Sequence, residues 1–64
     1  MAEKWTRNLI GKMHNEGITY QELAEEMSVT KSYISMILNG SRTPKGIKKR
    51  MENALASIIT RRNT

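Results

Sequence analysis

The side chains that could take part in catalysis are few. The chain has no cysteine and a single histidine, His14, so it has no thiolate, no disulfide and too few ligands for a zinc site. Glu22, Glu25 and Glu26 stand close together, but no nucleophile, metal ligand or paired carboxylate accompanies them. A chain of 64 residues also has little room for a substrate pocket. We therefore expect no enzymatic activity, metal, cofactor or small-molecule substrate.

A second set of side chains suits binding. Within residues 30–38, Ile34, Ile37 and Leu38 recur at helical spacing and form a stripe that must be buried. The side chains that point the other way are Lys31, Ser32, Ser35 and Met36. Together they present a cation, two hydroxyls and an apolar group on one outward face. Met36 has no core to fill there, so it is either a contact residue or a tolerated exposed one.

The net charge of +5 is unevenly distributed along the chain. Residues 1–26 carry three basic side chains against five glutamates, a balance of −2, and residues 27–64 carry eight against one, a balance of +7. A basic half of this kind favours a polyanionic partner. The alternative is a solvated basic face that serves solubility.

Length and hydrophobicity indicate the class of protein. Residues 1–64 suffice for one domain, near the lower limit for folding without disulfides or metals. No apolar run approaches the roughly 20 residues that cross a bilayer, and no stretch resembles a signal peptide. Because cysteine is absent, a reducing compartment is the natural setting. We expect a cytoplasmic domain that does not contact a membrane.

Local signals predict the first two helices. The apolar residues of a helix over about residues 4–16 are Trp5, Leu9, Ile10 and Met13, and Trp5 should cover the core next to the last helix. Gly17 stands where this helix would stop, and Ile18 can pack just ahead of the next. The sequence Thr19-x-x-Glu22 is a capping box that opens a second helix, which ends near Met27.

The third helix follows after only Ser28 and Val29. Thr30 caps it, and Asn39-Gly40 ends it with glycine in a left-handed conformation. A turn this short prevents antiparallel packing, so the second and third helices must cross steeply, as in a helix-turn-helix. The residues expected to fill the crossing are Leu23, Ala24, Val29, Ile34 and Ile37.

One long C-terminal helix is predicted over about residues 45–61. Pro44 suits its entry, and from Ile47 onward the apolar residues keep helical period without glycine or proline. The residues that can cover the other helices are Ile47, Met51 and Leu55. Ile58 and Ile59 are expected to lie beyond that core. The predicted fold is thus all-α, a small bundle of four helices.

Residues 19–40 resemble the helix-turn-helix of the lambda-repressor and Cro family of phage and bacterial regulators. The stretch QELAEEM is similar to the second helix of the family, and SYISMILNG to its recognition helix with the Asn-Gly that follows. The likeness covers about residues 5–40. Two features depart from it: Ser28 occupies a position often held by glycine, and one continuous helix replaces the usual fourth and fifth.

The resemblance implies that the third helix enters the major groove of double-stranded DNA with its N-terminal residues at base edges. By position, the base-reading residues would be Lys31, Ser32, Ser35 and Met36. Their chemistry agrees, because lysine can reach the O6 and N7 atoms of guanine, serine can donate or accept, and methionine can cover a thymine methyl.

The resemblance also implies contacts to phosphates, which fix the register of a protein on DNA. The family uses the start of the second helix, where amides converge on an anion. The candidate phosphate-binding residues are Thr19, Tyr20, Gln21, Tyr33, Asn39, Arg42 and Lys45. Asn39 fits a plain helix cap equally well, and Tyr33 a half-buried packing residue. Lys48, Lys49 and Arg50 fit a solvated face better than a DNA contact.

These observations predict a sequence-specific DNA-binding transcriptional regulator of repressor or Cro type, from a phage, mobile element or bacterium, associated with the nucleoid. The alternatives are a protein-interaction module on the same fold, such as an antitoxin or adaptor, and a nonspecific nucleic-acid binder. Because one recognition helix reads few base pairs, a homodimer is expected, with Ile58 and Ile59 of the C-terminal helix in its interface. Alternatively, both isoleucines fold back onto Trp5 and Leu9 in a monomer.

Overall fold

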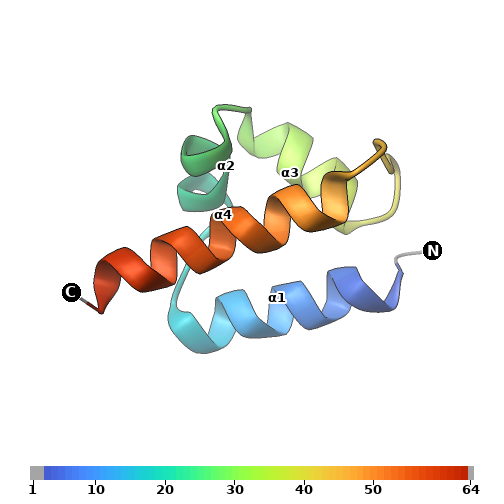
Figure 1. The fold of residues 1–64 in the computed structure, drawn as a ribbon. Coiled ribbons are helices and arrows are strands. Elements are labelled where there is room, and N and C mark those ends of the chain that lie inside the picture. Colours follow the sequence, from blue (N-terminus) through green and yellow to red (C-terminus); the bar gives the residue numbers. More distant parts are fainter. Residues whose placement is uncertain (1–2, 64) are drawn as a thin grey trace.

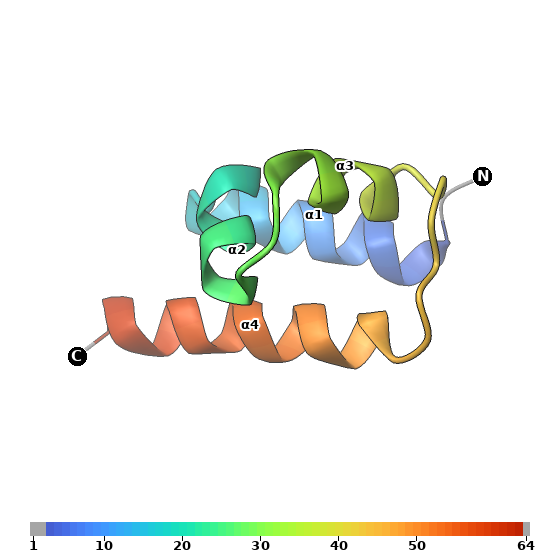
Figure 2. The same cartoon turned by 90° about the horizontal axis from the view of Figure 1, so that it is seen from above.

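The computed structural model describes residues 3–63. They form four helices and no strand: α1 (Lys4–Glu16), α2 (Tyr20–Met27), α3 (Lys31–Leu38) and α4 (Ile47–Arg62). In Figure 1, α1 and α4 lie side by side and run in the same direction, with α2 and α3 above them, and Figure 2 looks down onto α2 and α3. The predicted all-α bundle is confirmed, including a single continuous C-terminal helix.

Caps fix the ends of the first helices as predicted. Gly17 closes α1 with φ 68°, in the left-handed region that glycine adopts without strain. The amide of Ile18 then donates to the Met13 carbonyl at 2.8 Å, which turns the chain toward α2. At the start of α2, the Thr19 hydroxyl accepts from the Glu22 amide at 3.1 Å and the Glu22 carboxylate accepts from the Thr19 amide at 3.5 Å. The capping box is therefore present.

The turn between α2 and α3 is formed around a strained serine. Ser28 has φ 60° and ψ 40°, and it is the one non-glycine residue of the described chain with a positive φ. Its amide donates to the Glu25 carbonyl at 3.2 Å, and the Val29 amide donates to Ala24 at 2.9 Å. These two hydrogen bonds form a Schellman motif, in which the residue in the left-handed conformation is most often glycine. Ser28 therefore adopts the left-handed conformation that this motif requires, although it carries a side chain.

The predicted start of the last helix is wrong by two residues. The chain does not enter a helix at Pro44; instead the Ile47 amide donates to the Pro44 carbonyl at 3.1 Å and closes a turn. Gly46 has φ 75° and ψ 6°, values expected for the third residue of a type II turn. Because this conformation interrupts the helix, α4 begins at Ile47, and Lys45 lies in the turn.

The core is formed by all four helices. Its buried hydrophobic residues are Leu9, Met13, Ile18, Leu23, Ala24, Ile34, Ile37, Leu38, Ile47, Met51, Ala54, Leu55 and Ile58. Ala24 is fully buried and α2 contacts both α3 and α4, as a close crossing requires. Val29, predicted as core, is only partly buried, and Trp5 packs against the core from the edge as predicted.

The expectation that Ile58 and Ile59 project beyond the core is wrong. The Ile58 side chain is 2% exposed and belongs to the core, and Ile59 is partly buried against it. Since α4 runs parallel to α1, its last turns lie beside the end of α1 and beside α2 (Figure 1), whereas Trp5 belongs to the first turn of α1. The isoleucines therefore do not fold back onto Trp5 either, and they no longer indicate a dimer interface.

Within residues 3–63, no helix is both long and apolar enough to cross a membrane.

Candidate nucleic-acid interface

The outward face of α3 has a fixed orientation, because the other side of this helix is packed in the core. The Thr30 hydroxyl accepts from the Tyr33 amide at 3.1 Å, which confirms the predicted N-cap. On the inner side, Ile34, Ile37 and Leu38 are buried. Such a helix has a fixed position and a fixed rotation about its axis, so the same side chains always face solvent.

The four candidate base-reading residues lie on that outer side. Lys31 and Ser32 are exposed, and Ser35 and Met36 are partly buried. In the described part of the chain, several partly buried hydrophobic residues pack against the core, and Met36 is not one of them. Its side chain is therefore a surface feature of α3 and not a part of the packing. The face combines one cation, two hydroxyls and one thioether.

The first turn of α2 offers backbone amides to an anion. A helix leaves its first amides without carbonyl partners, and the capping box here uses those of Thr19 and Glu22. The amides of Tyr20 and Gln21 remain as donors at the positive end of the helix dipole. The Gln21 side chain donates to the Glu25 carboxylate at 3.1 Å along the exposed side of α2, and Tyr20 packs partly against the core.

Tyr33 and Asn39 each have a local structural role. Tyr33 is half-buried and packs against the core, so only part of its side chain faces solvent. The Asn39 carboxamide oxygen accepts from the Ser41 amide at 2.8 Å and so holds the loop that follows α3. Its amide nitrogen, an N–H donor, is the group with the chemistry to contact a phosphate.

The loop after α3 carries the candidate cations Arg42 and Lys45, and both side chains are exposed. The amides of Ser41 and Arg42 donate to the Met36 carbonyl at 2.9 and 3.1 Å, so the start of the loop is fixed to the last turn of α3. The backbone of Arg42 thus has a defined position relative to the outward face of α3. Lys45 lies further on, in the turn before α4 and not in the helix as predicted.

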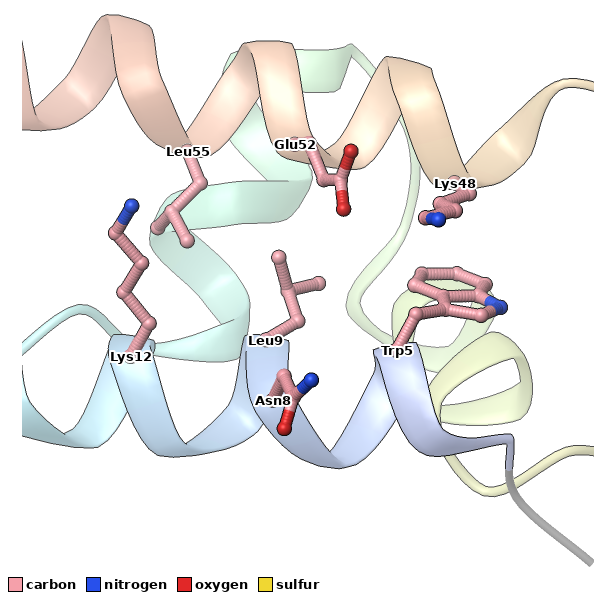
Figure 3. Close-up of a pocket in the computed structure, with 7 residues that line it drawn as sticks. All are labelled: Trp5, Asn8, Leu9, Lys12, Lys48, Glu52 and Leu55. Carbon is pink, nitrogen blue, oxygen red and sulfur yellow. The ribbon is translucent and has the colours of Figure 1, made fainter.

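The basic residues at the start of α4 face in different directions. Lys48 lines a groove of about 290 Å³ between α1 and α4, where Figure 3 shows it opposite Trp5. Arg50 lines a second groove, together with Glu26 and Met27, between α2 and α4. The floor of the first groove is apolar, formed by Leu9 and Leu55 (Figure 3). In the described chain, no three histidine, aspartate or glutamate side chains come together as metal ligands would.

Two arginines at the end of α4 form ion pairs that the sequence did not indicate. Arg61 pairs with Glu26 of α2, and Arg62 pairs with Glu22 at 2.6 Å. The residues of these pairs are 35 and 40 positions apart, so no local pattern reveals them. They link part of the positive charge of the C-terminal half to the glutamates of α2. Arg62 therefore reaches the first turn of α2, beside the candidate anion-binding amides.

The comparisons with known proteins agree with this geometry. A family model described as Helix-turn-helix matches residues 14–48, which is more than half of the chain and includes α2, the turn and α3. Comparison with curated proteins and with solved structures gave no match. Members of the matched family are DNA-binding regulators and generally have no enzymatic activity. The chain belongs to the helix-turn-helix family of lambda-repressor and Cro type.

Proposed function

We propose that this protein is a sequence-specific transcriptional regulator of repressor or Cro type that places α3 in the major groove of double-stranded DNA. In this proposal Lys31, Ser32, Ser35 and Met36 contact base edges. The phosphate contacts come from the start of α2, from Tyr33 and Asn39, and from the loop cations Arg42 and Lys45. The protein acts in the cytoplasm of a bacterium, on chromosomal or phage DNA.

The observation that carries the proposal is the two-sided character of α3. Its apolar side is fully enclosed, with Ile34 and Ile37 both 0% exposed, while its other side exposes Lys31 and Ser32. A rigid helix with donors at its N-terminal end has the shape and chemistry to read a groove about 12 Å wide.

The sharpest test is selection from a random duplex pool. The protein is mixed with random double-stranded DNA, the bound fraction is recovered and sequenced, and the cycle is repeated. A recurring motif of several base pairs supports a specific regulator. Enrichment without a motif indicates a nonspecific binder, and no retention of DNA at low salt indicates a protein-interaction module instead.

A two-fold dimer on DNA is a further part of the proposal. One recognition helix contacts only a few base pairs, and two half-sites one DNA turn apart, about 34 Å, give useful selectivity. Since Ile58 is in the core, the interface has to use other residues than those the sequence indicated. Footprinting tests this: protection of a two-fold repeated site supports the dimer, and a single unpaired half-site contradicts it.

A further inference from the structure

The first turn of α2 contains an acidic side chain where an anion is expected to bind. Glu22 is the third residue of α2, and its carboxylate bonds back to the Thr19 amide as part of the capping box. The Tyr20 and Gln21 amides that suit a DNA phosphate belong to the same turn. A carboxylate without a neutralising cation in this turn repels a phosphate, and so it opposes the attraction of the amides and of the helix dipole.

Arg62 cancels that charge. Its Nη2 atom donates to both carboxylate oxygens of Glu22, at 2.8 and 2.6 Å. Its Nη1 atom donates to the carbonyl oxygen of Glu16, the last residue of α1, at 2.6 Å. The guanidinium is thus held by two elements at once and stays beside the first turn of α2. With side-chain exposures of 40% for Arg62 and 35% for Glu22, the pair lies at the surface where a DNA backbone can approach.

We propose that Arg62 is a positioning residue for DNA binding: by pairing with Glu22, it lets this glutamate cap α2 without repelling the phosphate that the Tyr20 and Gln21 amides bind. The inference rests on the proposed function and adds a role for the last turn of α4, which itself contacts no base. The second ion pair provides a comparison. Arg61 neutralises Glu26, which lies one turn further along α2 and away from its N-terminus.

The test is a series of variants in which charges are removed, and their binding to the selected duplex and to a random duplex is measured by fluorescence anisotropy. Arg62→Gln should weaken binding about tenfold on both duplexes, because an uncompensated carboxylate acts on the phosphate through its charge alone. Glu22→Gln keeps the reciprocal capping bond and removes the charge, so it should not weaken binding. The double variant should bind within about threefold of the parent, because the charge that Arg62 offsets is gone.

Two matched variants distinguish the neutralisation of Glu22 from a general effect of net charge and from the shape of the arginine side chain. Arg61→Gln removes the same unit of charge, and it should weaken binding less than about threefold because its partner lies away from the first turn. Arg62→Lys retains the cation but loses the forked geometry of the guanidinium, so it should bind DNA more weakly than the parent and more tightly than Arg62→Gln. Thermal melting by circular dichroism is recorded for every variant, and the lysine and double variants keep the test decisive if Arg62→Gln folds poorly.

The outcomes separate the inference from the proposed function. If the parent binds duplex DNA but Arg62→Gln binds equally well, Arg62 has no positioning role. If the double variant is as weak as Arg62→Gln, Arg62 acts by touching the phosphate itself, and neutralisation of Glu22 is refuted. If the lysine variant is as weak as the glutamine variant, charge is not what matters. A parent that does not bind duplex DNA overturns the proposed function as well.

Discussion

The Val29 amide lies 2.9 Å from the carbonyl oxygen of Ala24, and this bond closes the turn that brings α3 across α2. To make it, the chain passes through Ser28 in a left-handed conformation with φ 60°. In this conformation the β-carbon crowds the following carbonyl oxygen, which costs an ordinary L-residue roughly 1–2 kcal/mol. The fixed crossing of the two helices therefore includes a local strain at one residue.

Replacing Ser28 with glycine should stabilise the protein. The relief of strain exceeds the extra entropy that glycine has in the unfolded chain, so a net gain of about 0.5–1 kcal/mol is expected. For a domain of this size that raises the melting temperature by roughly 2–8 °C. Thermal melting by circular dichroism measures it. Ser28→Ala is the control: it removes the hydroxyl and keeps the β-carbon, so it should bring no gain. A lower melting temperature for the glycine variant would contradict the strain at Ser28.

Enlarging Ala24 should damage the same crossing from the inside. Ala24 is 0% exposed, so Ala24→Leu has to displace neighbouring side chains or separate α2 from α3, at a cost of about 1–3 kcal/mol. This is a large part of the few kcal/mol that a core of this size provides. The matched control is Ala56→Leu, at an exposed position of α4, which should leave the melting temperature unchanged. Equal melting of both variants would mean that the helices do not meet at Ala24.

Truncating Ile58 tests its place in the core. Because the side chain is 2% exposed, Ile58→Ala should lower the free energy of unfolding by about 2–5 kcal/mol. Ile59→Ala, at a partly buried position, should cost less. Chemical denaturation at several protein concentrations measures both effects. If Ile58 belonged to a dimer interface instead, the loss would depend on concentration, and that result would contradict the assignment to the core.

Much of the fold could be predicted because its signals are local. Gly17, the Thr19-Glu22 capping box, Thr30 and Gly40 each act within a few residues, so the ends of α1, α2 and α3 follow from the sequence. The prediction places the start of α4 too early because Pro44 suits a helix entry, whereas Gly46 takes the third position of a type II turn and delays the helix to Ile47.

The remaining features depend on tertiary structure. How deeply Ile58 is buried depends on how far α4 runs beside α1 and α2, which helical periodicity does not specify. The pairing of Arg62 with Glu22 joins residues 40 positions apart. The outward face of α3 was predictable, since Ile34 and Ile37 fix which side of the helix is buried. Its contact with bases stays a prediction.

Lys31 and Arg42 should differ in what they contribute to DNA binding. Lys31→Ala should cost about 1–3 kcal/mol on the preferred site and relax the choice of one base, because it removes a base-edge contact. Arg42→Ala should weaken all sequences nearly equally, because a phosphate contact carries no sequence information. Repeating the duplex selection with each variant measures the difference. If both variants select the same motif as the parent, Lys31 does not read a base.

Binding should also depend strongly on salt. The cations that the proposal places against DNA are all exposed: Lys31, Arg42 and Lys45, which makes six in the proposed dimer. If about six phosphates are neutralised, the logarithm of the affinity should fall with the logarithm of salt concentration at a slope near −5, since each contact contributes about −0.9. Lys45→Ala should make the slope shallower by about one contact for each protomer on the DNA. Arg62→Gln should weaken binding most at low salt, because the repulsion between the uncompensated Glu22 carboxylate and a phosphate is screened as the salt concentration rises. Anisotropy titrations over a range of salt concentrations give these slopes, and a parent slope close to zero would mean that the partner is not a polyanion.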